Sequence, residues 1–172
     1  GRDQVEATLA KYSKVDARSV PTVRGKRVFF TTRKADQQQP VLAMRESSAG
    51  DDVVLVDPND MSKDHTTSVN LVSVSADGKL LMYGIRSGGE DEVELHLFDV
   101  DKRAELPGGL PKARYLGVAF DARKTGFWYS RWAKDGSRVR FHKLGEDPAR
   151  DALVFGDGLG PTEIPNASLS DN

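Results

Sequence analysis

The sequence predicts an all-β fold of about three four-stranded antiparallel sheets, preceded by a short helix. Three observations lead to this prediction. Short runs of β-branched and aromatic residues recur along the chain after Pro21. Clusters of Gly, Asp, Asn and Ser separate these runs. Similar turn sequences also return at a period of roughly 40–50 residues, which is typical of propeller blades. We therefore expect a partial β-propeller.

The chain begins with a segment of helical periodicity, from Arg2 to about Tyr12. Val5, Leu9 and Tyr12 follow one another at helical spacing, and Ala7 and Ala10 are strong helix formers. One short amphipathic helix is predicted here. We expect residues 1–18 to form this helix and a lead-in, and residues 19–172 to form the propeller fragment.

The predicted strands fall into three successive rounds. The first round contains residues 26–32, 41–45 and 53–56; the second contains 69–74, 79–85 and 93–100; the third contains 115–120, 126–131, 138–144 and 152–155. Residues 106–111 contain two prolines and are expected to break the second round. The predicted blades span about 19–62, 68–110 and 113–158, and a fourth is expected to start at 165–172.

Repeated turn chemistry favours blades over a β-sandwich with similar turn spacing. Gly25-Lys26 returns as Gly78-Lys79, and Ser75 matches Asp121 and then Ser170 in the following rounds. A sandwich has no reason to repeat its turns at a blade-sized period. Because propellers need about 4–8 blades to close, three rounds are expected to form an open arc. Its exposed blade edges predict self-association.

Composition excludes several classes of function. Lys and Arg number 25 against 26 Asp and Glu, so the net charge is −1 and no basic surface for nucleic acid or membrane is expected. The chain has no Cys, which excludes disulfides and thiolate metal sites. No apolar run approaches the ~20 residues of a membrane span. We expect a soluble protein, cytoplasmic or periplasmic, and the start at Gly1 indicates a piece of a longer chain.

The polar candidates for catalysis, metal binding or phosphate binding favour structural roles. His96 and His142 occupy corresponding places in the third strand of their rounds, and neither they nor His65 are expected to be catalytic. Acidic pairs such as Asp51-Asp52 do not match a calcium loop and are interpreted as turn residues. The glycines at 88–89 and 156–160 precede no Lys-Ser/Thr helix start, so we interpret them as loops.

The third round contains an aromatic cluster near several arginines. Alternation along a strand places Phe127 and Tyr129 on one face and Trp128 on the other. Trp132, Arg131, Arg138 and Arg140 complete the cluster. Stacking of single-stranded nucleic acid on such a surface is one hypothesis. Packing between neighbouring blades explains the aromatic pattern without a ligand, and we prefer that interpretation.

The order of several short motifs resembles the prolyl oligopeptidase family of serine peptidases. The run from Ser19 to Phe30 is similar to the beginning of that family's propeller. The other motifs are Gln37-Gln38-Gln39-Pro40-Val41-Leu42, Val56-Asp57-Pro58-Asn59, Ser75-Ala76-Asp77-Gly78-Lys79, Gly126-Phe127-Trp128-Tyr129 and Phe141-His142-Lys143-Leu144-Gly145. The resemblance covers essentially the whole chain, in the family's order.

The resemblance implies a parent enzyme that cleaves short peptides after proline. Such enzymes carry a Ser-His-Asp triad on an α/β-hydrolase domain, on which the propeller packs as a filter that admits flexible peptides. The family needs no metal or organic cofactor. Its Gly-x-Ser-x-Gly-Gly elbow does not occur in this sequence, so no catalytic residue is assigned here. This chain alone is expected to be inactive.

The resemblance also implies one substrate-binding residue. The family places an aromatic side chain from the start of its third blade near the bound peptide, and Tyr115 occupies that position. A packing role for Tyr115 is the alternative. For the chain as a whole, the alternative is a non-enzymatic propeller scaffold that binds a protein or peptide partner on its rim.

Overall fold

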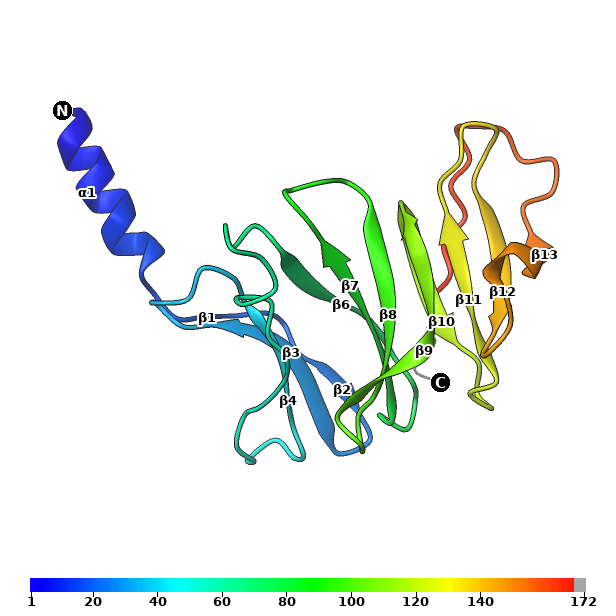
Figure 1. Ribbon diagram of the computed structural model, residues 1–172, viewed down its shortest axis with the longest axis horizontal. Helices are drawn as coiled ribbons and strands as arrows, with labels where there is room; N and C mark the ends of the chain where they lie inside the picture. The colour runs from blue at the N-terminus through cyan, green and yellow to red at the C-terminus, as the bar shows by residue number, and fades with distance from the viewer. Residues whose placement is uncertain (169–172) are drawn as a thin grey trace. The chain divides into compact units, whose positions relative to one another are not determined.

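The computed structural model describes residues 1–168, apart from the side chains of Lys11 and Ser13. The chain divides into two compact units between Val69 and Asn70. Three antiparallel sheets and one short α-helix account for its regular structure (Figure 1). The predicted all-β class and the helix at the beginning of the chain are confirmed.

The first unit contains the helix and one five-stranded sheet. These elements are α1 (Arg2–Ser13), β1 (Ala17–Arg18), β2 (Thr22–Arg24), β3 (Arg27–Arg33), β4 (Val41–Arg45) and β5 (Val53–Val56). The sheet order is β1-β3-β4-β5, with β2 paired to β3. The sequence did not predict β1 and β2, because strands of two and three residues are too short to show an alternating pattern.

Helix α1 keeps its apolar residues exposed. Val5, Leu9 and Tyr12 are 58%, 62% and 68% exposed. Its helical form therefore depends on local preferences, which include the alanines and an Arg2–Glu6 ion pair one turn apart.

The core of the first sheet is built on β3 and β4. Phe29 and Phe30 of β3 are fully buried, as are Leu42, Ala43 and Met44 of β4. The guanidinium of Arg18 lies 4.4 Å from the centre of the Phe30 ring. Arg18 and Arg45 both donate to the carboxylate of Asp52, at 2.5 and 2.6 Å. One carboxylate thus joins β1, β4 and the loop before β5 beside a buried ring.

The second unit contains two four-stranded sheets with their strands in consecutive order. The first comprises β6 (Ser68–Val74), β7 (Leu80–Arg86), β8 (Val93–Asp99) and β9 (Ala104–Ala113). The second comprises β10 (Tyr115–Phe120), β11 (Gly126–Arg131), β12 (Arg138–Lys143) and β13 (Ala152–Phe155), with the 3-10 helix η1 (Pro148–Arg150) before β13. Each is a meander of the kind that forms one propeller blade.

The predicted turn repeat has a physical basis in the two sheets of the second unit. The Ser75 hydroxyl accepts hydrogen bonds from the backbone N–H groups of Lys79 and Leu80. The Asp121 carboxylate does the same for Thr125 and Gly126. Each turn also contains a residue with a left-handed backbone conformation. This residue is Gly78, at φ 69°, in the turn after Ser75 and Lys124, at φ 56°, in the turn after Asp121. The same side-chain cap therefore starts both hairpins.

The two sheets of the second unit pack face to face through one apolar cluster. Its members come from β7 to β11 and are Met82, Val93, Leu95, Leu97, Leu110, Val118, Phe120, Phe127 and Tyr129. Trp128 lies on the other face of β11, where it contacts Phe141 at 5.3 Å between ring centres. The predicted separation of Phe127 and Tyr129 from Trp128 is confirmed, and the first two pack between the sheets.

The prediction that residues 106–111 break the second round is wrong, because β9 runs from Ala104 to Ala113. Among the described strands it pairs only with β8, so prolines on its other side need not donate to a ladder. Its register against β8 shifts on both sides of Leu95, and Gly108 adopts φ 107° in the shifted part. For the expected start of a fourth blade, residues 165–168 form no strand, and 169–172 lie outside the described residues.

Gly109 provides a test of the close approach between β8 and β9. A Cβ added at Gly109 would lie 2.1 Å from the backbone oxygen of Leu95, and neither backbone can move without disturbing the ladder. We expect Gly109→Ala to lower the free energy of unfolding by about 1–3 kcal/mol or more. Gly160→Ala is the matched control, because its Cβ would meet only the Glu163 carboxylate, at 3.5 Å. Urea unfolding of both variants checks this, and equal midpoints would contradict the packing described.

Asp52 provides a test of pH dependence in the first sheet. The Arg45 hydrogen bond, helped by the Arg18 charge, holds the pKa of Asp52 below its ordinary value of 3.8 despite an opposing effect of burial. A lowered folded-state pKa contributes stability above the ordinary pKa, and that stability is lost as pH falls through the folded-state value. Asp52→Asn should therefore cost roughly 1 kcal/mol or less at neutral pH.

The difference between Asp52→Asn and the unsubstituted chain should shrink as pH falls below 3.8 and vanish only below the lower, folded-state pKa, where the carboxyl is protonated in both states. Asp51→Asn is the control, since the neighbouring Asp51 forms no ion pair with any residue that the structure describes. Urea unfolding at neutral and acidic pH measures both variants. A cost for Asp52→Asn that does not depend on pH would show that its ion pairs contribute nothing.

Candidate functional site

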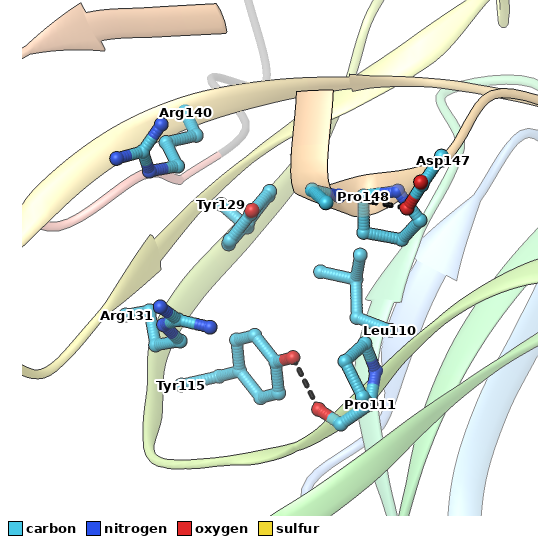
Figure 2. A pocket seen from close by; sticks show the side chains of 9 residues that line it. Leu110, Pro111, Tyr115, Tyr129, Arg131, Arg140, Asp147 and Pro148 are labelled. Carbon is cyan, nitrogen blue, oxygen red and sulfur yellow. Dashed lines mark hydrogen bonds between the residues drawn. The ribbon is translucent and has the colours of Figure 1, made fainter. Parts of the chain in front are cut away.

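A pocket of about 590 Å³ opens in the second unit, beside the cluster that joins its two sheets. It is lined by Leu110, Pro111, Tyr115, Tyr129, Arg131, Arg140, Asp147, Pro148 and Ala149. Figure 2 shows the two tyrosines and two arginines on one side, facing the leucine and prolines on the other. Aromatic and apolar walls with a few polar groups are typical of ligand pockets.

Tyr115, the substrate-binding residue implied by the resemblance, lies in this pocket. It is the first residue of β10, and its ring meets that of Tyr129 edge to face at 5.9 Å. Its hydroxyl donates to the carbonyl oxygen of Pro111. Burial is the main cause that raises the pKa of Tyr115, and Tyr129 adds to it. The ring is thus held in place as a neutral wall of the pocket.

Tyr129 is held by a buried network behind the pocket. Its hydroxyl donates to one carboxylate oxygen of Asp151 at 2.9 Å, and Nδ1 of His142 lies 2.9 Å from the other oxygen. The side chains of His142 and Asp151 are 0% and 3% exposed. Burial, followed by the bond to Asp151, raises the pKa of Tyr129. Because a carboxylate only accepts, we assign the donated proton to Nδ1 of His142.

The same network occurs in the other sheet of the unit. Tyr83 donates to Glu105 at 3.0 Å, and Nδ1 of His96 lies 2.8 Å from the second oxygen of that carboxylate. Tyr129, His142 and Asp151 each follow their counterpart by 46 positions, the spacing that also separates Ser75 from Asp121. The two histidines occupy the third strands, β8 and β12. The predicted structural correspondence of the two histidines is confirmed.

Geometry gives His142 no role as a catalytic base. Its ring is fully buried under Phe127, at 5.1 Å between ring centres. Its Nε2 has no hydrogen-bond partner among the residues that the structure describes, whereas a base must reach the proton that it removes. Within the same residues, no group of three or more His, Asp and Glu side chains is arranged to hold a metal ion.

Arg131, Arg140 and Tyr129 were predicted to belong to an aromatic and basic cluster, not to a pocket. The structure brings these three together with Tyr115 and leaves Trp128 on the opposite face. Asp147, Pro148 and Ala149 were not predicted. They reach the pocket because Asp147 caps η1, its carboxylate accepting from the N–H of Ala149. An Asp-Pro pair is a turn or helix-start signal, but it does not indicate what the turn will face.

Stacked four-stranded meanders with a repeated turn and a repeated side-chain network define the second unit as β-propeller blades. A family model described as the N-terminal β-propeller domain of prolyl oligopeptidase matches residues 1–172. The chain therefore belongs to the prolyl oligopeptidase family and matches its N-terminal propeller region. The fold and the family predicted from the sequence are both confirmed.

Similar proteins agree with this assignment. The prolyl endopeptidase of Elizabethkingia meningoseptica is 30% identical over 182 residues, covering 99% of this chain and 26% of that protein. The prolyl endopeptidase of Elizabethkingia miricola is 30% identical over 171 residues, covering 93% of this chain and 24% of that protein. The chain thus spans about a quarter of the length of these relatives.

Solved structures show the same fold. A prolyl endopeptidase from a study of inter-domain dynamics in catalysis and specificity has a TM-score of 0.80 and 27% identity, over 89% of this chain and 24% of that one. Prolyl oligopeptidase B from Galerina marginata has a TM-score of 0.71 and 21% identity, over 96% of this chain and 28% of that one. In the described residues, no helix is both long and apolar enough to cross a membrane.

The buried network behind the pocket can be tested against its exposed counterpart. In Asp151→Asn one oxygen acceptor becomes an N–H donor, so that either Tyr129 or His142 loses the acceptor for its proton inside the protein. We expect a loss of about 1–3 kcal/mol in the free energy of unfolding. Glu105→Gln makes the same change on a side chain that is 55% exposed, where water replaces the lost partner. Its cost should be clearly smaller, and equal costs in urea unfolding would contradict the burial described.

Proposed function

We propose that this chain is the substrate-gating propeller of a prolyl-oligopeptidase-like serine endopeptidase that cleaves short peptides after proline. The observation that carries the proposal is the match of the whole chain to that propeller family together with a pocket at Tyr115. Relatives named prolyl endopeptidase support the activity. Prolyl oligopeptidase B has been solved with a 35mer substrate bound, which supports a peptide as ligand.

We propose further that the propeller packs on an α/β-hydrolase domain of the same protein, and that this chain alone does not cleave peptides. One similar structure comes from a study of the role of inter-domain dynamics in catalysis and specificity, which supports a propeller that works with a second domain. The 172 residues contain no Gly-x-Ser-x-Gly segment, and the pairing of His142 with Asp151 is buried. Both facts support inactivity of the chain by itself.

Exposed apolar residues at the edge strand β13 support self-association of this chain. Leu153, Val154 and Phe155 are 43%, 52% and 59% exposed, on a strand that pairs only with β12 within residues 1–168. An unpaired strand edge with apolar side chains is a template for pairing with another copy. We propose this as a property of the chain when it is separated from the rest of its protein.

The test is cleavage of a chromogenic Gly-Pro peptide by the full-length product of the parent gene, assayed beside this 172-residue chain. We expect cleavage by the long form only. Tyr115→Ala in the long form should lower kcat/KM by about tenfold, the scale of one lost aromatic contact. Tyr115→Phe should change it little, because the hydroxyl is bonded to Pro111 and not free for a ligand.

Two other outcomes would overturn parts of this proposal. An absence of cleavage by both forms would favour the alternative, a non-enzymatic propeller scaffold for a protein or peptide partner. Normal cleavage by Tyr115→Ala would leave the peptidase activity standing and return Tyr115 to a packing role.

A further inference from the structure

Two arginines line the pocket, Arg131 and Arg140, and neither has a carboxylate partner among the described residues. Arg18, Arg27, Arg45 and Arg114 each form an ion pair with Asp or Glu. Arg131 forms no ion pair with a described residue, and Arg140 donates only to the backbone oxygen of Asp151, at 3.0 Å. Figure 2 shows Arg131 next to Tyr115, and Arg140 on the same side of the pocket as the two tyrosines. Two guanidinium groups therefore border the pocket without compensating carboxylates of their own.

The sheet places these two positive charges on one face. Arg131 is opposite Arg138, and Arg140 is opposite Tyr129, so Arg131 and Arg140 are diagonal neighbours on β11 and β12. Like charges at neighbouring positions repel, and an arginine cannot relieve the repulsion by losing its proton. An anion bound between them would remove the repulsion. The guanidinium group favours carboxylates in particular, because its N–H fork matches their two oxygens.

The remaining walls restrict what can carry that anion. Leu110, Pro111 and Pro148 are apolar and face the two tyrosine rings. Both tyrosine hydroxyls already donate a hydrogen bond, that of Tyr115 to the carbonyl oxygen of Pro111 and that of Tyr129 to the carboxylate of Asp151. Asp147 is the one carboxylate among the lining residues, and it is engaged with the N–H of Ala149. This combination fits a short apolar stem that ends in a single negative charge.

We propose that Arg131 and Arg140 form a subsite for a carboxylate side chain of the peptide, so that the enzyme prefers substrates with Glu or Asp at one position. The inference rests on the proposed function, since it presumes a peptide in this pocket. The resemblance to the family implied only one substrate-binding residue in this pocket, the aromatic Tyr115. The proposed subsite adds a preference for the charge of the substrate.

The first experiment measures kcat/KM of the full-length product for Gly-Pro-p-nitroanilide peptides. The peptides are extended before the Gly, and each position of the extension is occupied in turn by Glu, Gln or Lys. We expect Glu to exceed Gln by about three- to tenfold at one position, with Lys below both, and the preference to shrink as salt is added. In the double variant Arg131→Gln with Arg140→Gln, the Glu-to-Gln ratio should fall to about one.

Arg123→Gln is the matched control. Arg123 is an exposed arginine in the turn between β10 and β11 and does not line the pocket. It should keep the Glu preference. Cleavage of all peptides with no Glu preference at any position would overturn the subsite and leave the peptidase activity intact. Failure to cleave any peptide would overturn the proposed function instead.

A second measurement tests the subsite without cleavage. The 172-residue chain is titrated with acetyl-Glu-Gly-Pro-amide or its Gln counterpart, and the side-chain Nε–H signals of its arginines are followed by NMR. The Glu peptide should shift the signals of Arg131 and Arg140 and leave that of Arg123 in place. Equal responses to the two peptides would contradict the proposal even if the enzyme assay fails.

Discussion

A buried carboxylate must be hydrogen-bonded, because its hydration is lost and nothing in an apolar interior replaces it. Asp151 meets this requirement with Tyr129 and His142, which come from the second and third strands of its sheet. These bonds tie the loop after η1 to β11 and β12, so they set where β13 begins. They also fix the tyrosine that forms one wall of the pocket. The blade and its candidate site therefore depend on the same carboxylate.

Each of the three sheets has a side-chain network that joins its strands, but the residue types in the network differ. In the sheets of the second unit, a tyrosine, a histidine and a carboxylate join the second, third and fourth strands or the loop before the fourth. In the first sheet, Phe30 takes the tyrosine's place, and Arg45 and Asp52 replace the other two. Arg45 lies diagonal to Phe30 as His142 lies diagonal to Tyr129. Since Asp52 is more exposed than Asp151, a permanent charge can be tolerated there at little desolvation cost.

Strands that consist of a run of β-branched and aromatic residues between turn residues were predictable from the sequence. Val41–Arg45, Val53–Val56 and Tyr115–Phe120 have the predicted bounds, because β-branched and aromatic runs end there at turn residues. The strand β9 was not predictable, since its prolines are acceptable only where β8 pairs on one side and the register shifts. The candidate site was predicted in part. Tyr115 was found through a resemblance, whereas the positions of Arg140 and Asp147 relative to it depend on the packing of separate strands.

The face that Tyr115 occupies shows why simple alternation fails at this site. Counting in twos from Val118 and Phe120, which pack between the sheets, would place Tyr115 on the opposite face of β10. The register against β11 shifts between Tyr115 and Gly117, however, and this one-residue bulge returns Tyr115 to the face of Tyr129 and Arg131. Gly117 is required beside the bulge, since a Cβ there would lie 2.4 Å from the backbone oxygen of Ala167. A single extra residue in β10 thus decides whether the aromatic side chain lines the pocket or the far side of the sheet.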